Sequence, residues 1–342
     1  HPNLDVIPKI EVAGAVMLAP IWISSMTGGA ELAGKINLLL AEACKNHGLG
    51  MGLGSCRPVL ENSAFSNDFD IRKHIGEQPL FANLGIAQIE ELIASNQLQK
   101  LIDMVNRLQA NGLIIHVNPL QEWMQPEGDR FELSPLETVK RVLDAVNFPI
   151  IVKEVGQGFG PKSLEALLQL PLEALDYGAF GGTNFSKLEN LRRESLERGL
   201  LEPVQHLGHT AEEMTPWINS IAAKLSNKVQ CKRIIVSGGI SNFLDGFYHL
   251  QKLQMPSLYA QASPFLKYAL EGEDALNQFV DGSSALQFAH EDLKKDKEFV
   301  LAATSKQGFA LQFADESFKK DKEIVLAAVN NNGYALQFAD QS

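Results

Sequence analysis

The residues best suited to chemistry in this sequence lie between positions 112 and 132. The apolar run GLIIHV leads there into NPLQEWMQPEGDRFE, which is rich in amide, carboxylate and cationic side chains. Buried strands commonly end in polar loops that carry function. His116 and Arg57 could bind phosphate oxygens, because charge-assisted hydrogen bonds to such oxygens are strong. Glu122 and Glu127 could bind Mg²⁺, which prefers one or two carboxylates together with substrate phosphates. The alternative interpretation is a polar loop whose single histidine bonds a backbone group.

A lysine interrupts another apolar run, PIIVKEVG at 149–156. A buried ammonium group is costly unless it meets an anion or an electron-rich ring. We therefore expect Lys153 to point inward at a ligand. A simple ion pair with Glu154 is the alternative.

Glycine-rich segments follow two further apolar runs. Ser237, Gly238 and Gly239 come directly after RIIV, and Ala262-Ser263-Pro264 follows SLYAQ. Backbone N–H groups in such segments can approach a phosphate, although Ser-Gly-Gly taken alone more often marks a turn. Other runs end in small hydroxyls, amides and glycines, at 26–29, Ser55, Asn83 and 181–184.

Eight short apolar runs of this kind alternate with segments of helical periodicity. The runs are 21–29, 50–55, 80–85, 112–118, 149–156, 174–184, 233–240 and 257–264. Helices are predicted at 32–48, 89–112 and 134–147, the last opening with Ser134 as a cap. Eight strand-helix units predict an α/β protein with a (β/α)8 TIM barrel over residues 1–281, with every polar strand end on one face.

The character of the sequence changes after Gly282. Three similar segments follow, with Ala285, Ala310 and Ala335 spaced 25 residues apart. Each unit reads as two short helices, ALQFA and DKExVLAA, with Gly308 or Gly333 at a helix C-cap. We predict a short α-helical repeat appendage over residues 282–342. The simplest interpretation is that these helices only pack and take no part in chemistry.

Composition narrows the classes of function. The chain has 342 residues, a net charge of −11 and three cysteines without metal-site spacing. The acidic balance argues against a nucleic-acid partner, and the cysteines favour neither a disulfide framework nor a zinc site. Neither a membrane span nor a leader peptide is visible, so we expect a cytoplasmic protein.

Seven motifs together resemble, in order, the type 2 isopentenyl-diphosphate isomerases over roughly residues 1–280. They are MTGG at 26–29, GLGSCRP at 52–58, FANLG at 81–85, HVNPLQEWMQPEGDR at 116–130, IVKEVGQGFG at 151–160, GGTNF at 181–185 and SGGI at 237–240. The resemblance implies an FMN-dependent barrel that interconverts isopentenyl and dimethylallyl diphosphate. It further implies Mg²⁺, NADPH as the reductant of FMN, and a homo-oligomer, a tetramer or octamer.

The same resemblance assigns roles to individual residues. FMN would be held by Met26, Thr27, Gly28, Ser55, Asn83, Lys153, Thr183, Gly238, Gly239, Ser241, Ala262 and Ser263. The diphosphate would meet Ser55, Arg57, His116 and Asn118. Gln121 would lie at the reacting substrate carbon, Glu122 would bind Mg²⁺, and Glu189 would be a further acid or base.

Some features depart from that family. Ser241 and Ser263 stand where arginine is commoner, and Cys56 stands where glutamine is commoner. Members usually begin with an Arg-Lys arm that closes on the diphosphate, and the sequence starts after its expected place. Loss of such contacts, at about 1.5–3 kcal/mol each, would impair activity.

Two other classes of function stay open at this stage. An FMN-dependent α-hydroxy-acid oxidase would share the barrel, the strand lysine and the Ser-Gly-Gly segment. It needs a histidine base beside an arginine clamp, and no such pair is evident at the strand ends. A non-catalytic barrel that carries the repeats as an interaction module is the second alternative.

Overall fold

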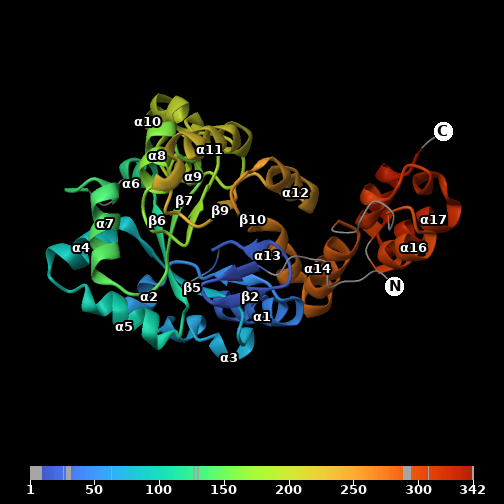
Figure 1. Ribbon diagram of the computed structural model, residues 1–342, viewed down its shortest axis with the longest axis horizontal. Helices are drawn as coiled ribbons and strands as arrows, with labels where there is room; N and C mark the ends of the chain where they lie inside the picture. The colour runs from blue at the N-terminus through green and yellow to red at the C-terminus, as the bar shows by residue number, and fades with distance from the viewer. Residues whose placement is uncertain are drawn as a thin grey trace.

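Eight parallel strands close into a barrel in the order β10-β3-β4-β5-β6-β7-β8-β9 (Figure 1). This computed structural model describes residues 10–25, 27, 32–62, 64–125, 128, 131–287, 294–306 and 308–340. The strands are β3 (Ile21–Ile23), β4 (Gly50–Gly52), β5 (Leu80–Gly85), β6 (Gly112–Val117), β7 (Ile150–Glu154), β8 (Ala174–Asp176), β9 (Ile234–Val236) and β10 (Ser257–Gln261). Each lies within one of the eight predicted runs, so the predicted (β/α)8 barrel is confirmed.

Helices surround the barrel. They are α1 (Ala33–His47), α2 (Arg57–Leu60), α3 (Arg72–Ile75), α4 (Ile86–Ala94), α5 (Gln99–Arg107), α6 (Pro119–Met124), α7 (Pro135–Ala145), α8 (Pro161–Leu168), α9 (Phe185–Leu191), α10 (Ser195–Leu201), α11 (Ala211–Leu225), α12 (Phe243–Lys252), α13 (Ser263–Glu271) and α14 (Glu273–Gln287). Short 3₁₀ turns are η2 (Ser66–Phe69), η3 (Glu202–His206) and η4 (Ser226–Lys228).

Local sequence explains where the predicted helices begin and end. Ser134 caps α7, because its side chain accepts a hydrogen bond from the backbone N–H of Glu137. Gly48 ends α1 in the left-handed conformation, with φ of 65°. The predicted helix over 89–112 is two helices, α4 and α5. Asn96 lies between them with φ of 56°, which an α-helix does not permit.

The barrel interior has a layer of apolar side chains drawn from alternate strand positions. Trp22, Phe81, Ile114, Ile151 and Ile235 all belong to this buried cluster. Residues two positions apart on a strand face the same side. The residues two positions further along β5, β6, β7 and β8 therefore also face the barrel axis, one layer nearer to the carboxyl ends of the strands.

An antiparallel hairpin precedes the barrel and was not predicted. Its strands are β1 (Ile10–Val12) and β2 (Ala15–Met17). The turn is Ala13-Gly14, with φ of 52° and 81°, which suits a tight two-residue hairpin turn. Val12 and Met17 pack with the interior apolar layer, so this hairpin covers the end of the barrel away from the polar strand ends.

The repeats have a small core of their own. Its elements are α16 (Lys297–Lys306), η5 (Gly308–Phe313), η6 (Phe318–Lys320), α17 (Lys322–Asn331) and η7 (Gly333–Phe338). Val300, Leu311, Ile324 and Ala335 are fully buried within it. The DKExVLAA segments are α-helices. The second and third ALQFA copies lie in the 3₁₀ turns η5 and η7, whereas Ala285–Gln287 of the first copy belong to α14. The C-cap predicted at Gly333 is wrong, because Asn332 caps α17 and Gly333 opens η7.

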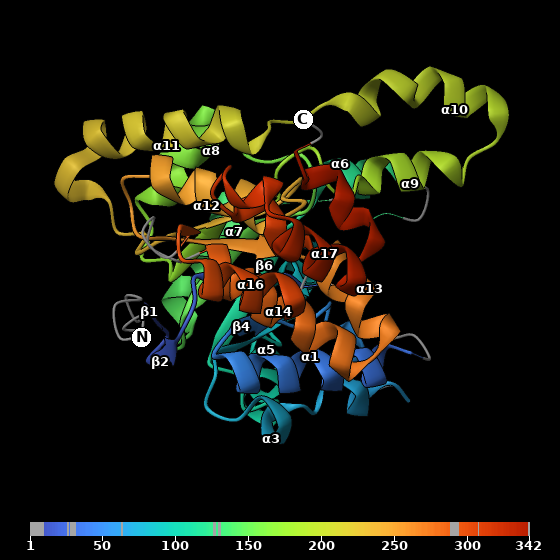
Figure 2. The same ribbon diagram turned by 90° about the vertical axis from the view of Figure 1, so that its right-hand side faces the viewer.

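The repeats lie on the side of the barrel that carries α13 and α14 (Figures 1 and 2). Helix α14 contacts α1 and α13 of the barrel as well as α16 and η5 of the repeats. The side chain of His47 lies 2.9 Å from Asn277 on α14 and so helps to hold that helix on α1. The predicted domain boundary at 281/282 falls inside α14, so one helix joins the two parts.

Candidate active site

A row of polar side chains crosses the barrel mouth, the end of the barrel at which the parallel strands finish. Asn83, His116, Lys153 and Asp176 come from the consecutive strands β5 to β8. In the strand register, His116 pairs with Lys153 and Lys153 pairs with Asp176. Each lies two residues beyond a member of the interior apolar layer, so the row faces the barrel axis.

The histidine of this row is held by the neighbouring amide. Nδ1 of His116 lies 2.9 Å from Oδ1 of Asn83. Asn83 donates from Nδ2 to the carbonyl of Leu53 at 3.0 Å, so its oxygen is the group that faces the imidazole. Burial, with Lys153 nearby, lowers the pKa of His116 to about 3. The imidazole is therefore neutral near pH 7, with Nδ1 as its donor and Nε2 as an acceptor.

The lysine and the aspartate lie side by side. Lys153 donates from Nζ to the backbone carbonyl of Glu154 at 2.6 Å. Asp176 is 1% exposed, and its Oδ1 accepts from the hydroxyl of Ser237. Burial raises the pKa of Asp176, and the Lys153 charge opposes that shift. The inward orientation predicted for Lys153 agrees with its place in the row.

The alternative partner considered for Lys153, the carboxylate of Glu154, is engaged elsewhere. Its Oε2 accepts three backbone N–H bonds, from Gly156 at 2.7 Å, Gln157 at 2.5 Å and Gly158 at 2.9 Å. These bonds fix the loop after β7. Burial raises the pKa of Glu154 to about 7, against the opposing effect of those donors.

A cavity of about 470 Å³ lies at the barrel mouth above β7 to β10. We call it the mouth cavity. Its lining includes Ser24, Ser25, Lys153, Thr183, Gly238, Gly239, Ser241, Ala262 and Ser263. Seven of the predicted FMN-binding positions therefore meet around one space. Gly238 has φ of 86°, and a Cβ there would collide with the Ala179 carbonyl, so only glycine allows this close passage of two loops.

Three buried polar atoms at the mouth have no hydrogen-bond partner in the described part of the chain. They are Ser25 Oγ, Asp176 Oδ2 and Gln261 Oε1. Buried polar groups are normally paired, so unpaired ones in a cavity wall indicate a polar ligand. Ser25 and Gln261 line the mouth cavity. The hydroxyl, amide and lysine groups together suit a polar heterocycle such as the flavin ring system, and in that sense these residues fit FMN.

The loop after β6 brings an amide and a carboxylate together. Asn118 donates from Nδ2 to Glu122 Oε1 at 2.8 Å and to Gln121 Oε1 at 3.3 Å. Glu122 is 9% exposed. Oδ1 of Asn118 is buried and has no hydrogen-bond partner among the residues that the structure describes. A carboxylate and an unpaired amide oxygen are both hard ligands, which suits Mg²⁺ that takes its other ligands from phosphate and water.

No group of three metal-ligating side chains occurs in the described part of the chain. These residues therefore fit a metal ion only in company with a ligand.

Other predicted site residues are less closely joined to this group. Ser55 and Arg57 follow β4; Ser55 is partly buried, while Arg57 is exposed and pairs with Glu61 at 2.6 Å. Glu189 on α9 is buried, and its Oε2 lies 2.6 Å from Arg192. Helix α9 packs against α6, which carries Gln121 and Glu122.

After β3, Thr27 donates from Oγ1 to Asn37 at 2.5 Å. Ser241 donates to Asp245 at 2.6 Å. Met26, Gly28 and Glu127 lie outside the described residues.

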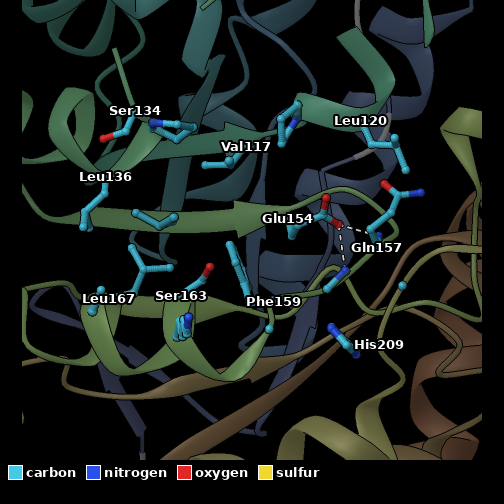
Figure 3. Close-up of a pocket in the computed structure, with 18 of the residues that line it drawn as sticks. Val117, Leu120, Ser134, Leu136, Glu154, Gln157, Phe159, Ser163, Leu167 and His209 are labelled. Atoms are coloured by element: carbon cyan, nitrogen blue, oxygen red, sulfur yellow. Dashed lines mark hydrogen bonds between the residues drawn. The ribbon is translucent and has the colours of Figure 1, made fainter. Parts of the chain in front are cut away.

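A second cavity, of about 560 Å³, lies outside the barrel between α7 and α8. Figure 3 shows apolar residues such as Leu136, Phe159 and Leu167 along it, with the Glu154 carboxylate at one end beside Gln157. It contains no predicted site residue. The same Glu154 loop thus separates this groove from the mouth cavity.

Comparison with known proteins decides the family. The chain is 34% identical over 269 residues to the isopentenyl-diphosphate delta-isomerase of Rickettsia felis, covering 78% of this chain and 74% of the relative. It is 35% identical over 281 residues to that of Ignicoccus hospitalis, covering 81% and 75%.

The chain belongs to the isopentenyl-diphosphate delta-isomerase family. Its type 2 form is the one that the sequence motifs resemble, and the expectation of an isomerase is confirmed at the level of the family.

Solved structures support the fold. A mandelate oxidase mutant with an FMN adduct matches with a TM-score of 0.53 and 14% identity, over 81% of this chain and 76% of that one. A flavocytochrome b2 mutant matches with a TM-score of 0.54 and 13% identity, over 81% and 66%. Identities this low show the barrel fold and no more.

The repeats match a different family. Residues 275–314 and 298–342 fit the family described as a domain of unknown function (DUF4116). Among the described residues, no helix is long and apolar enough to cross a membrane.

The sequence analysis missed Asp176, which completes the polar row. The signal was present, since Asp176 interrupts the apolar run ALDYG as Lys153 interrupts PIIVKEV. Gln261 and Ser25 were also missed. Both are ordinary polar residues at strand ends, and only the closed barrel shows that Ser25 Oγ and Gln261 Oε1 are buried without a partner among the described residues.

Proposed function

We propose that this protein converts isopentenyl diphosphate to dimethylallyl diphosphate, with reduced FMN and Mg²⁺. The observation that carries the proposal is the inward-facing row Asn83, His116, Lys153 and Asp176. It lies beside a cavity whose wall has polar atoms without a partner among the described residues. Membership of the isomerase family supports the choice of substrate. NADPH is the proposed reductant of FMN, and a tetramer or octamer is the proposed assembly.

The mouth cavity is the proposed flavin site. Its walls supply Lys153, Thr183, Gly238, Gly239, Ser241, Ala262 and Ser263. Thr27, Ser55 and Asn83 are further flavin positions that the sequence motifs of the family assign. Lys153 would supply a cation at the flavin ring, and the segment around Gly238, which leaves no room for a side chain, would let backbone N–H groups approach the phosphate. Reduced flavin can accept and donate a proton beside a substrate held in a water-poor pocket.

The ends of β4 and β6 and the loop after β6 are the proposed substrate site. Ser55, Arg57, His116 and Asn118 would bind the diphosphate, and Glu122 would bind the Mg²⁺ that bridges to it. Gln121 would lie at the reacting end of the substrate. The isomerisation removes one proton and adds another at the far end of the same allylic unit, so it needs an acid-base pair and no net oxidation.

Glu189 is the proposed further acid or base, and its carboxylate lies 2.6 Å from Arg192. Arg57 must also exchange its partner Glu61 for a phosphate oxygen. Whether the Arg57–Glu61 and Glu189–Arg192 ion pairs break therefore depends on whether the diphosphate reaches them.

The test is an anaerobic assay of the purified chain with FMN, Mg²⁺ and NADPH. Isopentenyl diphosphate is supplied, and dimethylallyl diphosphate is followed by proton NMR. We expect product, and we expect Lys153→Met and Glu122→Gln to reduce its rate at least tenfold, because each removes a charged contact of about 1.5–3 kcal/mol. The matched controls Lys162→Met and Glu137→Gln lie on the outer helices α8 and α7 and should keep the rate.

Flavin reduction by an α-hydroxy acid, with no isomerisation, would replace this proposal with the oxidase function. Flavin binding without either reaction would leave a non-catalytic barrel.

A further inference from the structure

The two described copies of the repeat expose the same surface to different degrees. Residues 25 positions apart correspond, so α16 corresponds to α17 and η5 to η7. Leu311 of η5 is 0% exposed, whereas its counterpart in η7, Leu336, is 57% exposed. Phe309 is half-buried, whereas its counterpart Tyr334 is 79% exposed. The second copy therefore leaves open an apolar surface that the first copy buries.

The helices of the two copies differ in the same way. Val325, Leu326 and Val329 of α17 are each more exposed than the residues 25 positions before them on α16. Residues at these spacings, one and four apart, lie on one side of a helix. We call Val325, Leu326, Val329, Tyr334 and Leu336 together the end face.

Helix α17 is the element that covers the first copy. It packs against both α16 and η5. Ile324 and Ala328, one turn apart on α17, are buried in the same cluster as Leu311. Among the described residues, no helix packs on the end face in the way that α17 packs on the first copy. The end face is thus the equivalent of the surface on which α17 lies.

A glycine marks the closest approach of α17 to the first copy. A Cβ on Gly308 would lie 2.3 Å from the Ala328 carbonyl oxygen, so only glycine lets the helix pack this closely. Gly333 has the same position in the second copy, where a Cβ would have nothing within 4 Å, and its φ is not positive. Neither a contact nor the backbone of the described chain thus requires glycine at 333. A helix packed on the end face as α17 packs on η5 would require it.

Charged groups also join the two helices. Nζ of Lys297, at the start of α16, lies 2.9 Å from Asp321 and 2.9 Å from Glu323, at the start of α17. Lys322 is the counterpart of Lys297, and it forms no ion pair with a described residue. A helix that begins with the same Asp-x-Glu sequence would bring two carboxylates to Lys322. Exposed ion pairs add little affinity but favour one orientation of a partner.

The other end of α17 is fixed by an asparagine. Oδ1 of Asn331 accepts from the backbone N–H of Gly308 at 2.7 Å, and Nδ2 donates to the Ser305 carbonyl at 3.3 Å. Asn331 follows Asp321 by ten residues. The carboxylates, the apolar stripe and this asparagine therefore define the kind of helix that the repeat surface accepts.

We propose that the end face is a docking site for one further helix of this repeat, with the pattern Asp-x-Glu-Ile-Val-Leu-Ala-Ala and an asparagine ten residues after the aspartate. The isoleucine and the second alanine of that helix pack on Leu336, its carboxylates pair with Lys322, and its backbone passes against Gly333. This inference concerns the repeats and does not depend on the proposed isomerase activity.

The probe is a fluorescein-labelled peptide with the sequence of residues 315–333, and its binding to the full-length protein is followed by fluorescence anisotropy. A free peptide of this length has little stable helix, so the helix forms on binding. We expect saturable binding with one peptide per chain. A control peptide that carries Ile324→Asp and Ala328→Asp should bind at least tenfold more weakly.

Variants of the protein locate the site. Gly333→Ala and Leu336→Asp should each weaken peptide binding at least tenfold, and Lys322→Met should weaken it about two- to fivefold. Leu200→Asp is the control, because Leu200 lies on the barrel helix α10 and is 74% exposed. The thermal unfolding midpoint of Gly333→Ala should not fall, since the added methyl group meets no atom of the described chain.

No saturable binding, or binding that neither Gly333→Ala nor Leu336→Asp weakens, would overturn this inference. Equal binding of the control peptide would overturn it as well, because the apolar stripe would then play no part. Sedimentation velocity tests the other occupant, a second copy of this chain. Self-association that Leu336→Asp abolishes would overturn the inference in favour of that second copy.

Discussion

His116 Nδ1 and Asn83 Oδ1 lie 2.9 Å apart on neighbouring strands, and this contact sets the proton pattern of the barrel mouth. Asn83 donates from Nδ2 to the Leu53 carbonyl, so its amide oxygen is the atom that faces His116. An amide oxygen can only accept, and the imidazole must therefore donate from Nδ1. Nε2 is then left with a lone pair. A phosphate oxygen only accepts hydrogen bonds, so diphosphate binding at His116 would require proton uptake at Nε2.

The neutral state of His116 predicts how stability depends on pH. Its pKa is about 3 in the folded chain and about 6.5 when unfolded, so between these values only the unfolded chain holds the extra proton. The free energy of unfolding should therefore fall as pH falls from 6.5, by up to about 1.4 kcal/mol per pH unit. Asp176 and Lys153 face the same space as His116. Both residues are present in the unmodified chain and in the His116 variant with which it is compared below.

Urea unfolding at pH 5 and pH 7.5 measures this slope. His116→Asn should flatten it, whereas His74→Asn, on the exposed helix α3, should keep it. The same slope in His116→Asn and in the unmodified chain would show that the imidazole is not buried neutral.

Glu154 should act in the opposite direction. Its pKa is about 7 folded against an ordinary value of 4.5, so between these values the folded chain holds a proton that the unfolded chain has lost. Its contribution is present below pH 4.5 and is lost as pH rises through 7. Glu154→Gln cannot lose that proton, and its amide oxygen can still accept from the loop.

The variant should therefore gain stability relative to the unmodified chain as pH rises from 5 to 7.5. Thermal unfolding midpoints at the two pH values give the comparison, with the surface variant Glu165→Gln as control. A constant difference between the proteins at both pH values would contradict the raised pKa.

Most of the barrel could be predicted from the sequence, because parallel strands buried on both sides leave continuous apolar runs such as GLIIHV. The hairpin was missed since IEVAGAVM is short and carries no Asn-Gly or Asp-Gly turn, and Ala13 adopts a conformation unusual for alanine. The break between α4 and α5 depends on Asn96, whose left-handed conformation periodicity does not reveal.

The candidate site was predictable where a polar residue interrupts an apolar strand, as with Lys153. The hydrogen bonds that form only in the closed barrel could not be predicted from the sequence. Nothing in the spacing shows that Glu154 would bond three N–H groups of its own loop, or that Asp176 would accept from the hydroxyl of Ser237.

Gly238 provides a test of the mouth cavity's backbone. Its φ of 86° and the adjacent Ala179 carbonyl leave no room for a side chain. Gly238→Ala should destabilise the fold by about 1–3 kcal/mol and weaken flavin binding. Gly199→Ala is the matched control, since Gly199 lies exposed on α10 with nothing within 4 Å of the added carbon. That change should be neutral or stabilise by up to about 1 kcal/mol. Equal stability of the two variants in urea would contradict the close approach at Gly238.

Glu173 provides the last prediction, at the end of the barrel opposite the mouth. It is 2% exposed and lies 2.8 Å from Lys232 and 2.9 Å from Arg233. It also accepts the backbone N–H of Ala13 in the hairpin turn at 3.2 Å. Glu173→Gln leaves the half-buried Arg233 charge, whose side chain is 13% exposed, without its anion, so we expect a loss of about 2–4 kcal/mol in the free energy of unfolding.

Glu165 pairs with Lys224 at 2.9 Å on the surface, where the same change should cost less than about 1 kcal/mol. Urea unfolding of both variants at pH 7.5 compares them directly. Similar small losses would mean that the Glu173 cluster is not needed to hold the hairpin against the barrel. The expected large difference would show that this end of the barrel is closed by charge as well as by Val12 and Met17.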